Sequence, residues 1–229
     1  MGSLQDVFSE EEVYDLTNYI IADRSWYDEN LDTFVIRNVN ELYAFADFVD
    51  YGIDFQNKTI RLANDIIINS GDANEWGEIP PIYSWNPIGT NIFRFKGTFD
   101  GQGHSIQGLY CKDEMHDVAL FDSVEGCTIK NVSLLNSFLS APWNGAFLGS
   151  FVAYGQGTFE SVYSNAILES PSNFVGGLIG FMKKGGISGE EQSQCTISNC
   201  WFDGKIIGGE YEAAGFVAEV RYTDVTVDN

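Results

Sequence analysis

The sequence has few positive charges, few histidines and no long hydrophobic run. Its 12 Lys and Arg face 33 Asp and Glu, which gives a net charge of -21. An acidic surface repels phosphates, so we expect no nucleic-acid partner. No stretch approaches the roughly 18 apolar residues of a membrane-spanning helix. We therefore expect no membrane span in this segment.

Metal-binding residue types are also scarce. The chain has two His and four Cys, and no C-x-x-C pair occurs. A structural zinc site therefore has little to draw on, and we expect no metal and no other cofactor. The many Asp residues leave calcium open, although the nonapeptide repeat of calcium-binding β-helices is absent.

The first residues, Met1–Asp6, contain neither the basic region nor the apolar run of a signal peptide. The strong acidity suits a secreted or surface-exposed protein, because charge keeps such a protein soluble. We expect an extracellular or cell-surface location, with any signal peptide outside this sequence.

Two short phrases recur in the second half of the chain. The first is apolar and flanked by small residues: Val118–Asp122 (VALFD), Gly145–Gly149 (GAFLG), Gly176–Gly180 (GGLIG) and Ala214–Ala218 (AGFVA). The second begins at Thr128 (TIKNV), Thr158 (TFESV) and Thr196 (TISNC). Each Thr precedes the next apolar anchor by 19 or 20 residues, whereas the reverse interval is 8, 11 and 18. A constant and a variable interval predict stacked units with a loop at one corner.

We predict an all-β fold, a right-handed parallel β-helix. Antiparallel hairpins would need two-residue turn signals between strands, and these are missing. Right-handedness follows from the crossover preference of twisted strands. The anchors Leu120, Phe147, Leu178 and Phe216 should form ladders inside the coils. The residues Thr128, Asn131, Thr196 and Asn199 should lie at corners, with side chains that satisfy backbone groups.

A short helical cap is predicted at the N-terminal end. Residues 33–36 read as a strand, and residues 41–51 as an amphipathic helix with Asn38 or Asn40 as N-cap and Gly52 as its stop. We predict two regions: residues 1–55, with the acidic segment, strand and capping helix, and residues 56–229, with the coils. The short phrases repeat from about residue 111.

The C-terminal end shows no comparable cap. Val217, Val220, Val225 and Val227 would lie at the open end of the stack, and open strand edges promote pairing. We expect a piece of a longer protein, or end-to-end self-association with a second copy.

The phrase GGLIG at Gly176–Gly180 resembles the GLUG motif of bacterial surface proteins. Gly145–Gly149 is a near match, and the other two copies lack the flanking glycines. The upstream stretch resembles the segment that precedes such repeats, and the likeness covers about residues 30–229. Its parts are Leu42–Gly52, Lys58–Ile68, Trp85–Gly89 and Phe95–Leu109. The resemblance implies an extracellular right-handed β-helix in adhesin-like bacterial proteins, with no catalytic residues.

The alternative is a polysaccharide lyase or glycoside hydrolase on a β-helix. Asp100 and His104 belong to a D-G-x-G turn that resembles one in pectin-degrading β-helices, where it mostly forms a corner. A hydrolase needs converging carboxylates about 5 to 9.5 Å apart. The candidates Asp122, Glu160, Glu169 and Asp203 occupy different positions in their repeats. Basic residues for a lyase are scattered likewise, so we assign no catalytic residue.

We therefore expect a non-catalytic module that acts in adhesion, in ligand binding or as a rigid spacer. A partner would be a host or matrix glycan or protein. The variable intervals Ser123–Cys127, Ser150–Gly157 and Phe181–Cys195 are the candidate binding face, because inserts on one side of a solenoid often bind ligands. The simpler interpretation is that they are tolerated surface loops. The ligand itself is not readable from the sequence.

Overall fold

The computed structural model describes residues 20–113, 116–171, 174–183, 194–208, 212–221 and 224–228. Within these ranges the chain is mostly strand with one α-helix, so the all-β prediction is confirmed. The elements are β1 (Thr33–Ile36), α1 (Val39–Asp50), β2 (Thr59–Leu62), β3 (Ile66–Ile67), the 3-10 turn η2 (Ala73–Glu75), β4 (Thr98–Asp100), β5 (Ser105–Gln107), β6 (Tyr110–Lys112), β7 (Phe121–Leu135), β8 (Phe138–Ser140), β9 (Phe147–Gly149), β10 (Val152–Ser164), β11 (Ile167–Ser170), β12 (Phe174–Gly176), β13 (Ile179–Lys183), β14 (Gln194–Ser198), β15 (Trp201–Phe202), β16 (Lys205–Gly208), β17 (Glu212–Ala214), β18 (Val217–Arg221) and β19 (Asp224–Asp228).

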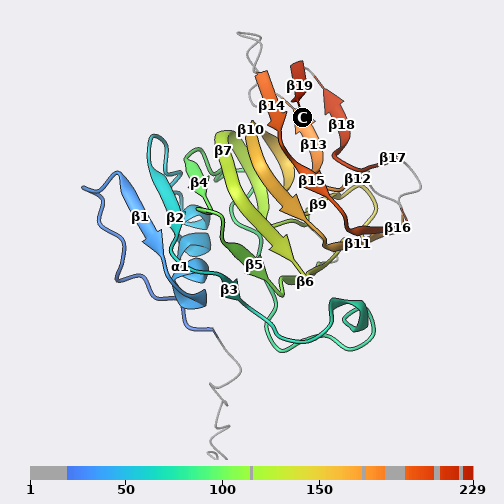
Figure 1. The fold of residues 1–229 in the computed structure, drawn as a ribbon, viewed down its shortest axis with the longest axis horizontal. Coiled ribbons are helices and arrows are strands. Elements are labelled where there is room, and N and C mark those ends of the chain that lie inside the picture. The colour runs from blue at the N-terminus through green and yellow to red at the C-terminus, as the bar shows by residue number, and fades with distance from the viewer. Residues whose placement is uncertain are drawn as a thin grey trace, which may run out of the picture.

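The strands form three sheets with parallel pairing (Figure 1). The long sheet runs β1-β2-β4-β7-β10-β13-β18, and β3, β5, β14, β15 and β19 pair alongside this path. The second sheet is β16-β11-β8-β6 and the third is β17-β12-β9. From β7 onward the chain visits the long, second and third sheets in turn and then returns to the long sheet. We call one such passage a circuit.

An inward column of apolar side chains runs across the long sheet. It consists of Phe34, Ile60, Phe99, Ile129, Phe159, Ile197 and Val227. The six members before Val227 are buried. One residue earlier, each strand carries a threonine that faces the other side: Thr33, Thr59, Thr98, Thr128, Thr158, Thr196 and Thr226. Alternation of inward apolar and outward polar residues thus fixes the register of the sheet.

This threonine column corrects the corner prediction for Thr128 and Thr196. Both lie within strands, where β-branched side chains suit the pleated surface. Asn131 and Asn199 do lie at corners, with φ values of 52° and 50°. Asn tolerates this left-handed conformation better than most residues, so the corner position of the two asparagines is confirmed. The Asn131 side chain, however, donates to the Asp100 carboxylate and not to a backbone group.

The predicted alignment of the apolar phrases is wrong at one copy. Gly176 pairs with Gly149 and Ala214, and Ile179 pairs with Val152 and Val217. The true equivalent of GGLIG is therefore residues 149–153, not residues 145–149. Phe147 instead neighbours Phe174 in the third sheet. The two segments, residues 145–149 and 149–153, have similar small and apolar residues and begin only four residues apart. Residue type alone does not distinguish them, and the prediction used the wrong segment.

Two of the three variable intervals are strands and not the expected surface loops, and ligand binding by this face stays a prediction. Ser123–Cys127 lies inside β7, and most of Ser150–Gly157 lies inside β10. These stretches pair with each other as strands, with one register shift at Gln156 and Gly157. The third interval, Phe181–Cys195, begins in β13 and ends in β14, and its residues 184–193 lie outside the described residues.

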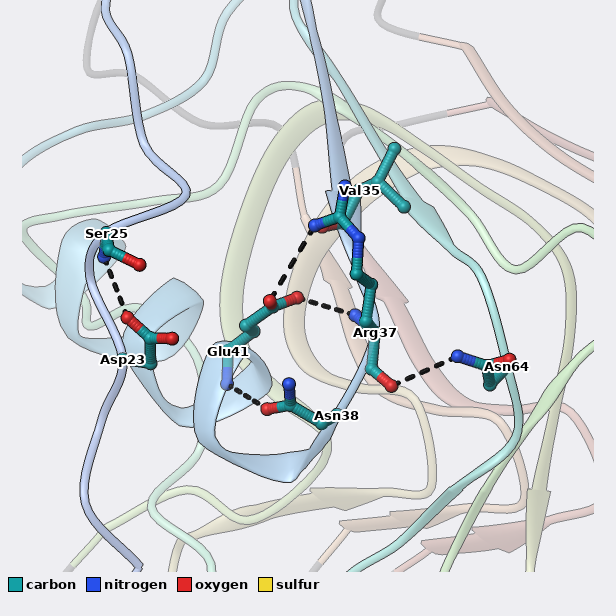
Figure 2. Close-up of polar contacts among 7 residues, drawn as sticks. All are labelled: Asp23, Ser25, Val35, Arg37, Asn38, Glu41 and Asn64. Carbon is teal, nitrogen blue, oxygen red and sulfur yellow. Dashed lines mark hydrogen bonds and ion pairs between the residues drawn. The ribbon is translucent and has the colours of Figure 1, made fainter.

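Helix α1 begins at a well-formed cap (Figure 2). The Asn38 side chain accepts a hydrogen bond from the Glu41 backbone N–H at 3.0 Å, as expected of an N-cap. Glu41 in turn accepts from the Arg37 backbone N–H at 2.6 Å. This carboxylate satisfies an otherwise exposed donor and suits the positive end of the helix. The prediction of the helix, with Asn38 as one of two N-cap candidates, is confirmed.

Helix α1 packs its apolar face against the inner side of the long sheet. Phe45 is fully buried and contacts the rings of Phe95, Phe99 and Phe121 at centroid distances of 5.5, 5.9 and 6.3 Å. Phe34 on β1 and Phe55 after the helix join the same continuous core. The predicted regional boundary near residue 55 stays a prediction.

The last described strands continue the columns of the long sheet. Val217 pairs with Ile179, and Val225 pairs with Cys195. Val220 and Val227 are 44% and 53% exposed. End-to-end association through this edge stays a prediction.

Candidate ligand-binding groove and buried carboxylates

One corner of the long sheet has the same backbone conformation in three successive circuits. Asn131, Ser161 and Asn199 have φ values of 52°, 54° and 50°. Each follows directly on the paired strand residues Lys130, Glu160 and Ser198. A single left-handed residue bends the chain there, and its side chain is left partly or fully exposed.

An outward column lies directly beyond this corner. Tyr163 on β10 pairs with Ser133 on β7 and with Trp201 on β15. The Trp201 side chain is 68% exposed, which is unusual for tryptophan, the residue type with the largest apolar ring. The column therefore presents a hydroxyl and two aromatic rings side by side.

Two depressions follow the corner and share Ser161. One, of about 480 Å³, is lined by Gln102, Gly103, Asn131, Val132, Ser133 and Ser161. The other, of about 290 Å³, is lined by Ser161, Val162, Tyr163, Asn199 and Trp201. We call the two together the corner groove. It carries amides, hydroxyls and aromatic faces, and none of the described residues that line it is charged.

Asp100 and His104 form the first turn of this corner. Asp100 accepts hydrogen bonds from the Gln102 backbone N–H and Asn131 Nδ2, each at 3.1 Å, and from Gln102 Nε2 at 2.6 Å. Burial alone would raise its pKa, but these bonds and the Lys130 ammonium at 3.8 Å hold the pKa below its ordinary value. His104 Nδ1 lies 3.5 Å from Asp65. These contacts fit the predicted corner role of the D-G-x-G turn.

A second cluster consists of carboxylates where α1 meets the segment 85–89. Asp50 accepts from the Gly89 backbone N–H at 2.8 Å and from Asn86 Nδ2 at 3.0 Å. Burial nevertheless raises its pKa to about 6. Burial also raises the pKa of Asp122 to about 7, and the charges of Asp117 and Asp50 add to this rise. A carboxyl group whose pKa lies near 7 can act as a proton donor, so the raised pKa values of this cluster are those of a candidate acid catalyst.

Of the four carboxylates considered from sequence, Asp122 alone belongs to this cluster. Glu160 faces outward from the long sheet, Glu169 lies on β11 of the second sheet, and Asp203 follows β15. The four do not converge, as expected. Sequence reasoning missed Asp50 and Asp117. A signal for Asp50 was present, because an acidic residue is unfavourable at the C-terminal end of a helix.

A third site is a pocket of about 230 Å³ beside the end of α1. Its charged lining residues are Asp54, Arg94, Lys96 and Glu125. Lys96 Nζ lies 3.6 Å from Asp54 and 3.4 Å from Glu125. The Arg94 guanidinium lies over the Tyr154 ring. The formal charges of this lining sum to zero, but both anions pair with Lys96, and the buried Arg94 Nε has no hydrogen-bond partner among the described residues.

The four cysteines are buried and free of disulfides. Cys200 and Val162, which precede the paired residues Trp201 and Tyr163, are both buried in the core. Among the described residues, no three His, Cys, Asp or Glu side chains are grouped to hold a metal ion. In the same part of the chain, no helix has the length and apolar character needed to span a membrane.

No family model matches the chain, and no solved structure matches it. A protein of Evansella cellulosilytica, described as "Putative Gly-rich membrane protein", is 30% identical over 80 residues. The match covers 34% of this chain and 9% of that protein. The chain thus spans a small part of the length of the relative that it matches.

Proposed function

We propose that this chain is a non-catalytic, extracellular ligand-binding module of a bacterial cell-surface or secreted protein, built as a right-handed parallel β-helix. The repeated visits to three parallel sheets support the β-helix, with the preferred crossover hand. Helix α1, which packs on the inner side of the long sheet, serves as its N-terminal cap. The resemblance of Gly176–Gly180 to the GLUG motif supports the cell-surface assignment.

The single observation that carries ligand binding is the corner groove. On the outer face of the long sheet, four successive paired positions carry charges of alternating sign, Arg61, Asp100, Lys130 and Glu160. The corner groove differs from this row because it combines uncharged polar side chains with the aromatic rings of Tyr163 and Trp201. A spacer needs only a soluble outer surface and gains nothing from an exposed tryptophan, so the groove favours binding over a purely structural role.

An array of glycans and matrix proteins, probed with the labelled chain, tests this proposal. We expect saturable binding to at least one class of ligand. Absence of saturable binding to every array member would favour the rigid spacer.

The carboxylates Asp50 and Asp122 favour an enzyme as the second candidate, a glycoside hydrolase or polysaccharide lyase. Incubation with acidic and neutral polysaccharides, followed by detection of reducing ends and unsaturated products, separates the two candidates. We expect no product. Turnover that is lost in Asp122→Asn, or in Asp100→Asn or His104→Ala, would establish the enzyme instead.

A further inference from the structure

We infer that the corner groove binds an extended, uncharged polysaccharide, with successive sugars lying across successive circuits. This inference rests on the proposed function and specifies the class of its ligand. Tyr163 and Trp201 would serve as stacking platforms, and the amide and hydroxyl side chains of the corner would bind the sugar hydroxyls.

The aromatic rings provide the first argument. Trp76 and Trp85 are almost fully buried, whereas Trp201 is 68% exposed next to Tyr163. Exposed aromatic rings cost solvation free energy, and they are typical of recognition sites because one ring buries a large area at a low entropic cost. The C–H-rich face of a pyranose ring matches the flat face of Tyr or Trp.

The polar lining provides the second argument. Gln102, Asn131, Ser133, Ser161 and Asn199 supply both donors and acceptors. A sugar hydroxyl needs both, because it donates one hydrogen bond and accepts others. Hydrogen bonds from Gln102 and Asn131 to Asp100 orient these two amides and leave their carbonyl oxygens available as acceptors.

Charge selects a neutral ligand. Among the described residues, no ionised side chain lines the corner groove. The residues directly before its corner are Lys130, Glu160 and Ser198, and the Lys130 ammonium already lies 3.8 Å from the Asp100 carboxylate. The whole chain has a net charge of -21. A uronic-acid polymer would approach against this field without a cation in the groove to pair with its carboxylates.

Geometry selects an extended chain. The corner residues repeat once per circuit on parallel strands, which lie about 4.8 Å apart. This spacing is close to the rise per sugar of an extended β-linked glycan. The two depressions share Ser161 as a lining residue, so a polymer that lies along the corner would contact both.

Titration calorimetry of the full chain with cellohexaose, xylohexaose, laminarihexaose and hexagalacturonate tests the inference. We expect at least one neutral hexamer to bind and hexagalacturonate not to bind. Trp201→Ala and Tyr163→Ala should each weaken binding by about 10-fold or more. The matched control is Trp143→Ala, which removes a 49% exposed tryptophan outside the corner groove and should leave affinity unchanged.

Two further readouts separate stacking from folding. Trp201→Phe keeps an aromatic face and should retain more affinity than Trp201→Ala, while circular dichroism should show unchanged secondary structure in every variant. Tight binding of hexagalacturonate, or neutral-hexamer affinity unchanged by both alanine variants, would overturn the inference. If a ligand from the array binds both alanine variants as tightly as the parent chain, the inference about the corner groove is overturned, but the proposed ligand-binding function is retained. If no member of the array binds, both the proposed function and the inference about the corner groove are overturned.

Discussion

The Asp50 carboxylate accepts a hydrogen bond from the Gly89 backbone N–H at 2.8 Å, and this contact joins the end of α1 to a distant loop. The same loop joins the long sheet, because Ile88 donates its N–H to Leu120 and accepts from the Asp122 N–H. Three segments thus meet where Asp50 and Asp122 are withdrawn from water. Their raised pKa values are the electrostatic cost of this junction.

The junction predicts a pH-dependent stability. The pKa values of Asp50 and Asp122 rise from about 3.9 in the unfolded chain to about 6 and about 7 in the folded protein. The folded state therefore holds extra protons between these values, and the contribution to stability is fully present below pH 4 and lost as pH rises through 6 and 7. Asp122→Asn should raise the free energy of unfolding by roughly 1 to 3 kcal/mol at pH 8, and change it little at pH 4.

Urea denaturation of both proteins at the two pH values measures this difference. Asn at position 122 can still accept the hydrogen bond from Ser123 Oγ, so no polar contact is lost. The control is Glu160→Gln, which neutralises an exposed carboxylate on the same long sheet and should change the free energy of unfolding at pH 8 much less than Asp122→Asn does. An Asp122→Asn effect that is equal at pH 4 and pH 8 would contradict the prediction.

The repeated corner predicts a stabilising substitution. Ser161 adopts a φ of 54° between Asn131 above and Asn199 below, and serine tolerates this conformation less well than asparagine. Ser161→Asn should therefore raise the free energy of unfolding by roughly 0.5 to 1 kcal/mol. Ser133→Asn, which places the same side chain on an extended strand, should give no such gain. A thermal melting temperature that falls for Ser161→Asn would show that the corner does not follow backbone preference.

A buried asparagine should be costly to remove. Asn69 is 5% exposed; its Nδ2 donates to the carbonyls of Tyr83 at 2.7 Å and Gly108 at 2.9 Å, and its Oδ1 accepts from the Tyr83 N–H at 3.0 Å. Asn69→Ala leaves these backbone groups without that partner and should cost roughly 2 to 4 kcal/mol in unfolding free energy. Asn64→Ala removes an exposed asparagine with a bond to Arg37 O at 3.2 Å and should cost well under half as much. Equal losses in denaturant titrations would refute this account.

The fold was predictable where local patterns repeat. Strand β1, helix α1 and the Asn38 cap follow from alternation, amphipathic spacing and side-chain chemistry within a few residues. The threonine and Phe/Ile columns depend on pairing between strands 26 to 39 residues apart. The recurring phrases at Thr128, Thr158 and Thr196 indicated that these segments are equivalent, but they did not show that the threonines lie within strands. The predicted alignment of Gly145–Gly149 with Gly176–Gly180 was wrong because similar glycine-flanked apolar pairs occur at two different places in one circuit.

The candidate sites were less predictable because they form between distant segments. The corner groove depends on Ser133, Tyr163 and Trp201, three unlike residues that share a column only through the register of β7, β10 and β15. No motif connects them. Asp50 and Asp122 meet only through the loop at Gly89, and burial, not sequence proximity, raises their pKa values.

The cysteines carry the last prediction. Burial raises the pKa of Cys111 to about 12, with the charges of Asp113 and Asp122 adding to it, and burial raises the pKa of Cys195 to about 11. A thiolate is the reactive form, so the native protein at pH 8 should react with a disulfide reagent far more slowly than a free thiol. Unfolding in guanidinium should expose all four thiols at once.

Asn199→Cys provides the matched control, because position 199 is exposed and directly precedes the buried Cys200. This variant should release one equivalent of reporter within seconds while its four native thiols stay protected. The protected thiols should then react only at the rate at which the core opens, and that rate should be the same in the variant and the parent chain. Rapid labelling of any native cysteine in the parent chain would show that the column containing it is not closed to solvent.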